Sequence, residues 1–263
     1  MGSRARLRAL VTNAPTRDAV LAEAVSCPQH APQRLDVELL ETVLPATAGG
    51  AATHGARGAA LAVDAPRRAL WARGQRFVLL DADMVALQRP DALLDALEDD
   101  SAWSGGEALL AVPAFRLKRQ SFGAAASGGG FNAGVLLVRA PAAADADALS
   151  ALVARAGVDD TEETLLNKLF HGRWGELPRG YNVPKRVLAH APQLWAQLVA
   201  AREIVFLHFL GAKPWMRDAA ARRGADWEAD RAEYAALERV WVRVREGAAA
   251  AADGTLLHLL APP

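Results

Sequence analysis

This chain of 263 residues has almost no cysteine and no formal net charge. Cys27 is the only cysteine, which excludes an internal disulfide and argues against a cysteine-based zinc site. The 30 lysine and arginine residues are balanced by 30 aspartate and glutamate residues. No net field therefore draws the chain to nucleic acid or to an anionic membrane, and we expect neither as a partner.

Long hydrophobic runs are also missing. No run approaches the roughly 20 apolar residues that span a bilayer, and residues 1–15 lack the apolar core of a signal peptide. We therefore expect a cytoplasmic protein without a membrane span. Because 52% of the residues are apolar, the chain can bury a large core. We expect one domain over residues 1–218, with a C-terminal helix and tail over residues 219–263 packed on it.

Short apolar runs alternate with segments of helical periodicity along most of the chain. The runs predict strands at residues 7–12, 35–41, 77–80, 109–113, 133–139 and 204–209. The periodic segments predict helices at residues 17–26, 91–98, 161–170 and 227–246. This alternation indicates an α/β fold with a mostly parallel sheet flanked by helices. Asp160 or Thr161 is expected to cap the helix at 161–170, and the spacing of Asp160 and Glu163 is typical of a capping box.

Two aspartates follow the predicted strand at residues 77–80. Side chains two residues apart in an extended chain point the same way, so Asp81 and Asp83 can converge on one point beyond the carboxyl end of the strand. That point suits a divalent cation. Taken alone, such a pair more often belongs to a turn or a helix cap, and a histidine in an apolar strand, such as His208, is more often a core residue.

The aspartate pair belongs to a series of five short segments that follow one another along the chain. They are LDAD at residues 80–83, FNAG at 131–134, EETLLN at 162–167, LPRGYN at 177–182 and HFLGAKPW at 208–215. Together they resemble the glycogenin-like glycosyltransferases, family eight of the nucleotide-sugar transferases, over residues 7–245. The resemblance implies a single GT-A domain with a Rossmann-like nucleotide-binding sheet. It also implies transfer of a hexose from a UDP-sugar, with retention of anomeric configuration.

The resemblance implies a role for particular residues. A Mn²⁺ or Mg²⁺ ion would be held by Asp81, Asp83 and His208, and would stabilise the charge that grows on the departing diphosphate. The other implied donor contacts are Gly211, Lys213 and Ala82 near the diphosphate, Arg67 or Arg68 on a phosphate, Thr12 and Asn13 on the base, and Asn132, Ala133, Gly134 and Glu162 around the sugar.

The chain departs from the family pattern at several places, among them Arg67 and Arg68, where relatives usually carry a lysine. Residues 12–20, TNAPTRDAV, lack the aromatic residue that stacks on uracil in relatives. Relatives often carry Asp-Gln or Glu-Gln where this chain has Glu162 and Glu163. Residues 183–207 contain no tyrosine, so self-glucosylation as in glycogenin is not expected. The acceptor is therefore expected to be a separate glycan, polyol or other small molecule.

Two other functions stay open from the sequence. The missing aromatic residue would suit a catalytically weak or inactive homologue that binds a nucleotide-sugar or a glycan. The segment VLLDADMV at residues 78–85 also resembles the haloacid dehalogenase-type phosphatases, in which Asp81 would be the nucleophile and Asp83 the general acid. The Gly-Thr expected after that motif is replaced here by Met84 and Val85.

Overall fold

The computed structural model describes residues 7–11, 35–39, 76–81, 83–103, 105–115, 129–139, 143–156, 160–215 and 232–245. The predictions for Thr12, Asn13, Arg67, Arg68 and Ala82, and for the helix at residues 17–26, lie outside these described residues. Within them, no helix is both long enough and apolar enough to cross a membrane.

The largest sheet has four strands in the order β3 (Phe77–Leu80), β6 (Phe131–Val138), β5 (Leu109–Pro113) and β7 (Trp174–Glu176). Strand β6 runs antiparallel to both β3 and β5, whereas β5 and β7 are parallel. Strands β1 (Leu7–Val11) and β2 (Leu35–Leu39) pair in parallel, as a β-α-β opening requires. The α/β class is confirmed, with mixed rather than mostly parallel pairing, because an apolar run does not reveal the direction of its strand.

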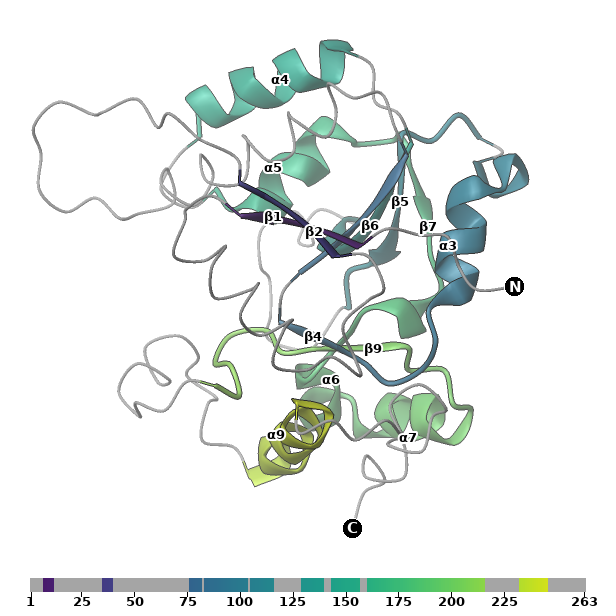
Figure 1. Ribbon diagram of the computed structural model, residues 1–263, viewed down its shortest axis with the longest axis vertical. Coiled ribbons are helices and arrows are strands. Elements are labelled where there is room, and N and C mark those ends of the chain that lie inside the picture. The colour runs from purple at the N-terminus through teal and green to yellow at the C-terminus, as the bar shows by residue number, and fades with distance from the viewer. Residues whose placement is uncertain are drawn as a thin grey trace, which may run out of the picture.

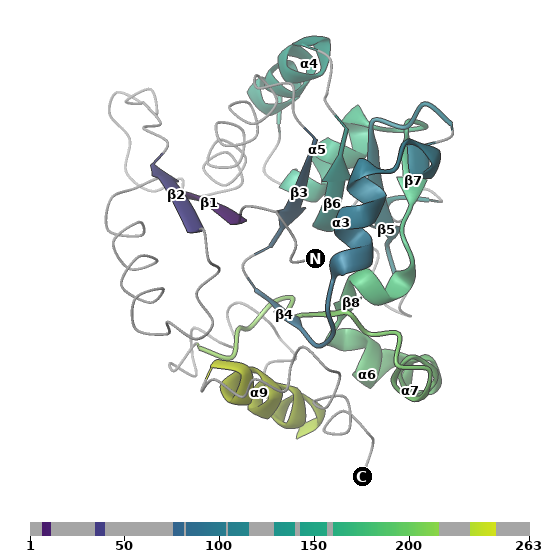
Figure 2. The ribbon, with the colours of Figure 1, turned by 45° about the vertical axis from the view of Figure 1, so that its right-hand side comes forward.

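Helices cover both faces of this sheet (Figures 1 and 2). Strand β6 is buried along its whole length. On one face Leu136 and Val138 pack against α4 (Ala143–Ala154) and α5 (Glu162–Leu169). On the other face Val135 and Leu137 pack with residues of α3 (Asp91–Glu98) and the 3-10 helix η1 (Asp100–Trp103). Burial on both faces explains why the run at residues 133–139 is continuously apolar.

A second sheet lies beside the first and has the strand order β4 (Met84–Ala86), β9 (Phe206–His208) and β8 (Val183–Pro184). Figure 1 shows it next to α6 (Arg186–His190), α7 (Pro192–Ala200) and α9 (Ala232–Arg245). Its core includes Trp195, Leu207, Phe209 and Tyr234. Helix α9 lies within the predicted amphipathic segment and buries its apolar stripe here. The domain division at residue 218 stays a prediction.

The N-terminus of α5 differs from one of the sequence predictions. Thr161 is the N-cap, and its hydroxyl accepts a hydrogen bond from the backbone N–H of Thr164. The Thr164 side chain in turn bonds to the backbone of Thr161, which completes the capping box. The predicted box between Asp160 and Glu163 is therefore wrong, because the helix starts one residue later than that spacing requires. Glu163 is free to point elsewhere.

Candidate metal centre

Asp81 and Asp83 lie where the chain passes from the first sheet to the second. Strand β3 ends at Leu80 and β4 begins at Met84. The Asp81 N–H donates to the carbonyl of Gly134 in β6, at 2.9 Å. The Asp83 carbonyl accepts from the N–H of Phe209, also at 2.9 Å. Both sheets therefore fix the backbone of the aspartate pair.

Pairing between β4 and β9 brings His208 to the same point. Met84 is the register partner of His208. The His208 Nε2 atom lies 3.2 Å from Asp83 Oδ1 and 3.6 Å from Asp81 Oδ2. One possible ligand atom from each residue lies within 4.8 Å of the others. The structure thus brings the three predicted ligands together, and their role as ligands stays a prediction.

The surroundings of His208 Nε2 suit a bound cation. The side chain is only 1% exposed, and Nε2 makes no hydrogen bond to any residue that the structure describes. A buried polar atom without such a bond is costly, and here it faces two carboxylates. A divalent ion would satisfy all three groups at once. Two carboxylates and one imidazole form a donor set that Mn²⁺ and Mg²⁺ accept, so the residues fit the predicted ion.

Asp83 is held in its charged form. Burial would raise the pKa of its carboxyl group, but the close contacts with His208 and Lys213 outweigh burial and lower the pKa from 3.8 to about 2. Lys213 Nζ pairs with Asp83 Oδ2 and also donates to the Phe209 carbonyl, at 2.9 Å. The predicted diphosphate lysine therefore lies at the candidate metal centre.

A bulge in β6 leaves backbone N–H groups beside these residues without partners on β5. The register with β5 shifts between Ala111 and Val112, whose partners are Leu136 and Asn132. Residues 133–135 consequently have no partner on β5. Side chains bind the released groups instead: Gly134 N–H donates to Asn132 Oδ1 at 3.0 Å, and Ala133 N–H donates to a carboxylate oxygen of Glu163 at 3.3 Å.

Glu163, the neighbour of the predicted Glu162, bonds to the FNAG segment. The same Glu163 oxygen accepts from Asn132 Nδ2 at 2.8 Å. Burial raises the pKa of Glu163, partly offset by the hydrogen bond from the Ala133 N–H. The sequence analysis missed this residue because it was placed in a capping box. The available signal was its i, i+4 spacing with Asn167, which also bonds to Phe131 of β6.

Gly134 provides the space that His208 occupies. A Cβ atom at this position would lie 2.6 Å from His208 Cε1 and 2.7 Å from Nδ1. This packing role is the simpler alternative to a sugar contact for Gly134. The predicted sugar contacts of Asn132, Ala133, Gly134 and Glu162 stay predictions. Glu162 is the first residue of α5 and is partly buried.

A buried lysine supports the segment that carries Gly211 and Lys213. Lys185 is 1% exposed, and its Nζ donates to the carbonyl of Ala212 at 2.8 Å. The same Nζ lies 4.7 Å from the ring centroid of Tyr234 in α9, a cation–π contact. Gly211 has a φ of +77°, which favours glycine there. The position of Lys185 in the sequence did not predict that it supports this segment.

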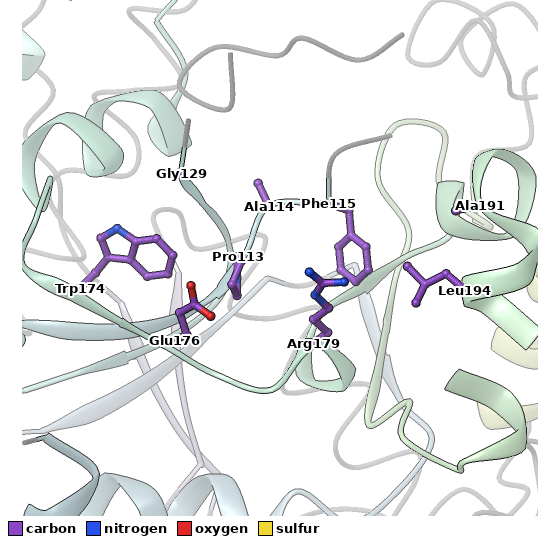
Figure 3. A pocket seen from close by; sticks show the side chains of 10 residues that line it. Pro113, Ala114, Phe115, Gly129, Trp174, Glu176, Arg179, Ala191 and Leu194 are labelled. Atoms are coloured by element: carbon purple, nitrogen blue, oxygen red, sulfur yellow. The ribbon is translucent and has the colours of Figure 1, made fainter. Parts of the chain in front are cut away.

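An open cleft of about 440 Å³ lies close to the FNAG segment. It includes Gly129 and Gly130, which directly precede Phe131 in β6. Figure 3 shows Trp174 and Glu176 on one side, and Phe115, Arg179 and Leu194 on the other. The Trp174 ring meets Phe131 edge to face at 5.2 Å. The cleft offers an aromatic wall, one carboxylate and one guanidinium.

Solved structures of glycosyltransferases are among those similar to this chain. GlyE from Streptococcus pneumoniae TIGR4 is 17% identical with a TM-score of 0.48, and the match covers 92% of this chain and 58% of that one. A galactosyltransferase LgtC structure with donor and acceptor sugar analogues is 18% identical with a TM-score of 0.47, over 87% of this chain and 99% of that one. This chain thus spans little more than half of the GlyE chain.

Comparison with curated proteins finds no match. In contrast, the sequence model of the family described as "Glycosyl transferase family 8" matches residues 69–219. That range is more than half of the chain and contains Asp81, Asp83, His208 and the five segments that carry the resemblance. The chain belongs to glycosyl transferase family 8.

Proposed function

We propose that this chain is a metal-dependent, retaining glycosyltransferase that moves a hexose from a UDP-sugar to a separate acceptor. One observation carries the proposal: Asp81, Asp83 and the buried, unbonded Nε2 of His208 converge on one point. A divalent ion held there would stabilise the negative charge that develops on the diphosphate as the glycosidic bond breaks. Retention and the UDP donor follow from the family resemblance.

Lys213 would share the stabilisation of the diphosphate. Its ammonium group pairs with Asp83 in the structure, and a carboxylate that ligates an ion attracts a lysine less strongly. The ammonium could then turn to a phosphate oxygen of the donor, which Gly211 lets approach the backbone. Asn132, Gly134 and Glu162 are the proposed sugar contacts. Ala82, Thr12, Asn13 and Arg67 complete the proposed donor site.

The cleft beside β6 is the proposed acceptor site. Its volume suits a small saccharide or polyol. Trp174 offers an apolar ring face for the C–H side of a sugar, and Glu176 and Arg179 offer an acceptor and donors for hydroxyl groups. Carboxylate and guanidinium balance in charge, which favours a neutral ligand. Because Gly130 lies two residues before Asn132, an acceptor there would approach the proposed sugar site.

A weak or inactive homologue is the second candidate, supported by the lack of an aromatic residue in residues 12–20. The phosphatase hypothesis has lost its basis, because the chain belongs to a glycosyltransferase family. The test is release or transfer of sugar from a panel of UDP-sugars with Mn²⁺ and with a chelator. Sugar release that depends on Mn²⁺ supports the enzyme. UDP binding with Mn²⁺ but without sugar release supports the binding homologue.

A further inference from the structure

Asn182 connects the FNAG segment to the metal centre. It follows the short 3-10 helix η3 (Arg179–Tyr181) and is fully buried. One end of its amide lies 2.6 Å from Asn132 Oδ1, and the other lies 2.9 Å from His208 Nδ1. The side chain therefore contacts the imidazole on the edge opposite Nε2.

A backbone group fixes the direction of every hydrogen bond in this connection. Gly134 N–H can only donate, so the Asn132 atom that faces it is the oxygen Oδ1. The Asn182 atom beside that oxygen must donate, so it is Nδ2. The remaining Asn182 atom, Oδ1, is an acceptor and faces His208 Nδ1. A neutral His208 must therefore carry its proton on Nδ1.

We infer that Asn182 is a positioning residue that holds His208 as the Nδ1–H tautomer and keeps the Nε2 lone pair directed at Asp81 and Asp83. The aspartates alone would favour the opposite tautomer, because a carboxylate 3.2 Å away would attract a proton on Nε2. A histidine with that proton could not ligate an ion through Nε2. The consequence for metal binding rests on the proposed function, whereas the tautomer itself does not.

The bulge in β6 contributes to the orientation of His208. The bulge frees Gly134 N–H from the ladder, and this group orients Asn132. Glu163 holds the other end of the Asn132 amide, at 2.8 Å. Hydrogen bonds thus run without a break from Glu163 through Asn132 and Asn182 to His208. A carboxylate at one end and a backbone N–H in the middle prevent either amide from turning over.

Nitrogen NMR of the metal-free protein tests the tautomer directly. The chain has six histidines, and the His208→Gln variant identifies the signals of His208. At alkaline pH we expect the ¹⁵N shifts and couplings of a neutral ring protonated at Nδ1. In Asn182→Ala the Nδ1–H signature should be lost. In Asn182→Asp it should persist, because a carboxylate also accepts from Nδ1–H.

Asn167→Ala is the matched control. Asn167 is another buried asparagine near β6, but its side chain bonds to the Phe131 backbone and to the Glu163 carbonyl. Its loss should leave the His208 tautomer unchanged. Calorimetric titration with Mn²⁺ alone should show about a 10- to 100-fold weaker affinity in Asn182→Ala, the usual effect of removing a partner of a ligating histidine.

An Nε2–H tautomer or an imidazolium for His208 in the metal-free wild type would overturn the inference, as would an unchanged tautomer in Asn182→Ala. An Nδ1–H tautomer that depends on Asn182, in a protein that does not bind Mn²⁺, would support the inference and contradict the proposed function. The two claims can therefore fail separately.

Discussion

A Cβ atom on Gly134 would lie 2.6 Å from Cε1 of His208, closer than any such contact in a relaxed protein. The glycine of FNAG and the histidine of HFLGAKPW therefore share one space. In Gly134→Ala we expect His208 to move away from the aspartates and Mn²⁺ affinity to fall at least about tenfold. Overpacking should also lower stability by roughly 1–3 kcal/mol. Calorimetry and thermal unfolding measure the two effects.

Gly175→Ala is the control for that variant. A Cβ at Gly175 in β7 would lie 2.6 Å from Leu110 Cδ2, the same separation from the end of a side chain. Gly175→Ala should therefore show a similar loss of stability but normal Mn²⁺ affinity. Equal Mn²⁺ affinity in both variants would contradict the packing role of Gly134.

Lys185→Met tests the support of the segment that carries Gly211 and Lys213. Methionine fills a similar volume but leaves the buried Ala212 carbonyl without the hydrogen bond from Nζ. We expect a loss of roughly 1 kcal/mol in stability and a severalfold weaker affinity for UDP in the presence of Mn²⁺. Lys168→Met, at an exposed lysine paired with Asp160, should change neither value. Unchanged UDP affinity in Lys185→Met would show that the segment does not need Lys185.

Glu163→Gln should stabilise the protein at neutral pH. Burial raises the pKa of Glu163 above its usual 4.5, so the folded state holds its proton more tightly than the unfolded chain does. The resulting cost is absent below about pH 4 and grows as pH rises through the folded pKa. Glutamine can accept the bonds from Asn132 and Ala133 without this cost. We expect a melting temperature about 2 °C higher at pH 8 and no difference near pH 4.

That pH dependence separates charge from packing. A glutamine that merely packed better would raise the melting temperature equally at both pH values. A lower melting temperature at pH 8 would mean that the ionised carboxylate contributes to stability there.

Trp174→Ala tests the acceptor cleft. Loss of the aromatic wall should raise the KM for a saccharide acceptor about tenfold, equivalent to ~1.4 kcal/mol. Affinity for Mn²⁺ should stay the same, because Trp174 belongs to β7 and makes no described contact with the metal centre. Initial rates over a range of acceptor concentrations give the KM. A changed Mn²⁺ affinity with a normal acceptor KM would remove the cleft from the proposal.

Local patterns in the sequence predicted much of the fold. Strand β3 and helix α3 have the predicted bounds, and β5 matches residues 109–113. The meeting of Asp81, Asp83 and His208 was predicted through the family resemblance. Composition and periodicity alone pointed only to the aspartate pair, because the contact with His208 depends on pairing between distant strands.

Other parts of the site could not be predicted because they depend on register. The bulge at residues 133–135 leaves no mark in an apolar run, yet it determines which groups bind Asn132 and Glu163. The choice of Thr161 over Asp160 as N-cap decided the role of Glu163. Asn182 ends the LPRGYN segment and Lys185 follows it. Neither residue type nor spacing predicts their partners, because these partners come from distant strands and loops.

Pulsed electron paramagnetic resonance of Mn²⁺ bound to the protein tests the central claim most directly, because it detects nitrogen nuclei that ligate the ion. With UDP present, the account predicts coupling to one imidazole nitrogen that disappears in His208→Gln, and much weaker Mn²⁺ binding in Asp81→Asn and Asp83→Asn. Bound Mn²⁺ without any imidazole coupling, or with a coupling that survives in His208→Gln, would contradict a metal centre formed by these three residues.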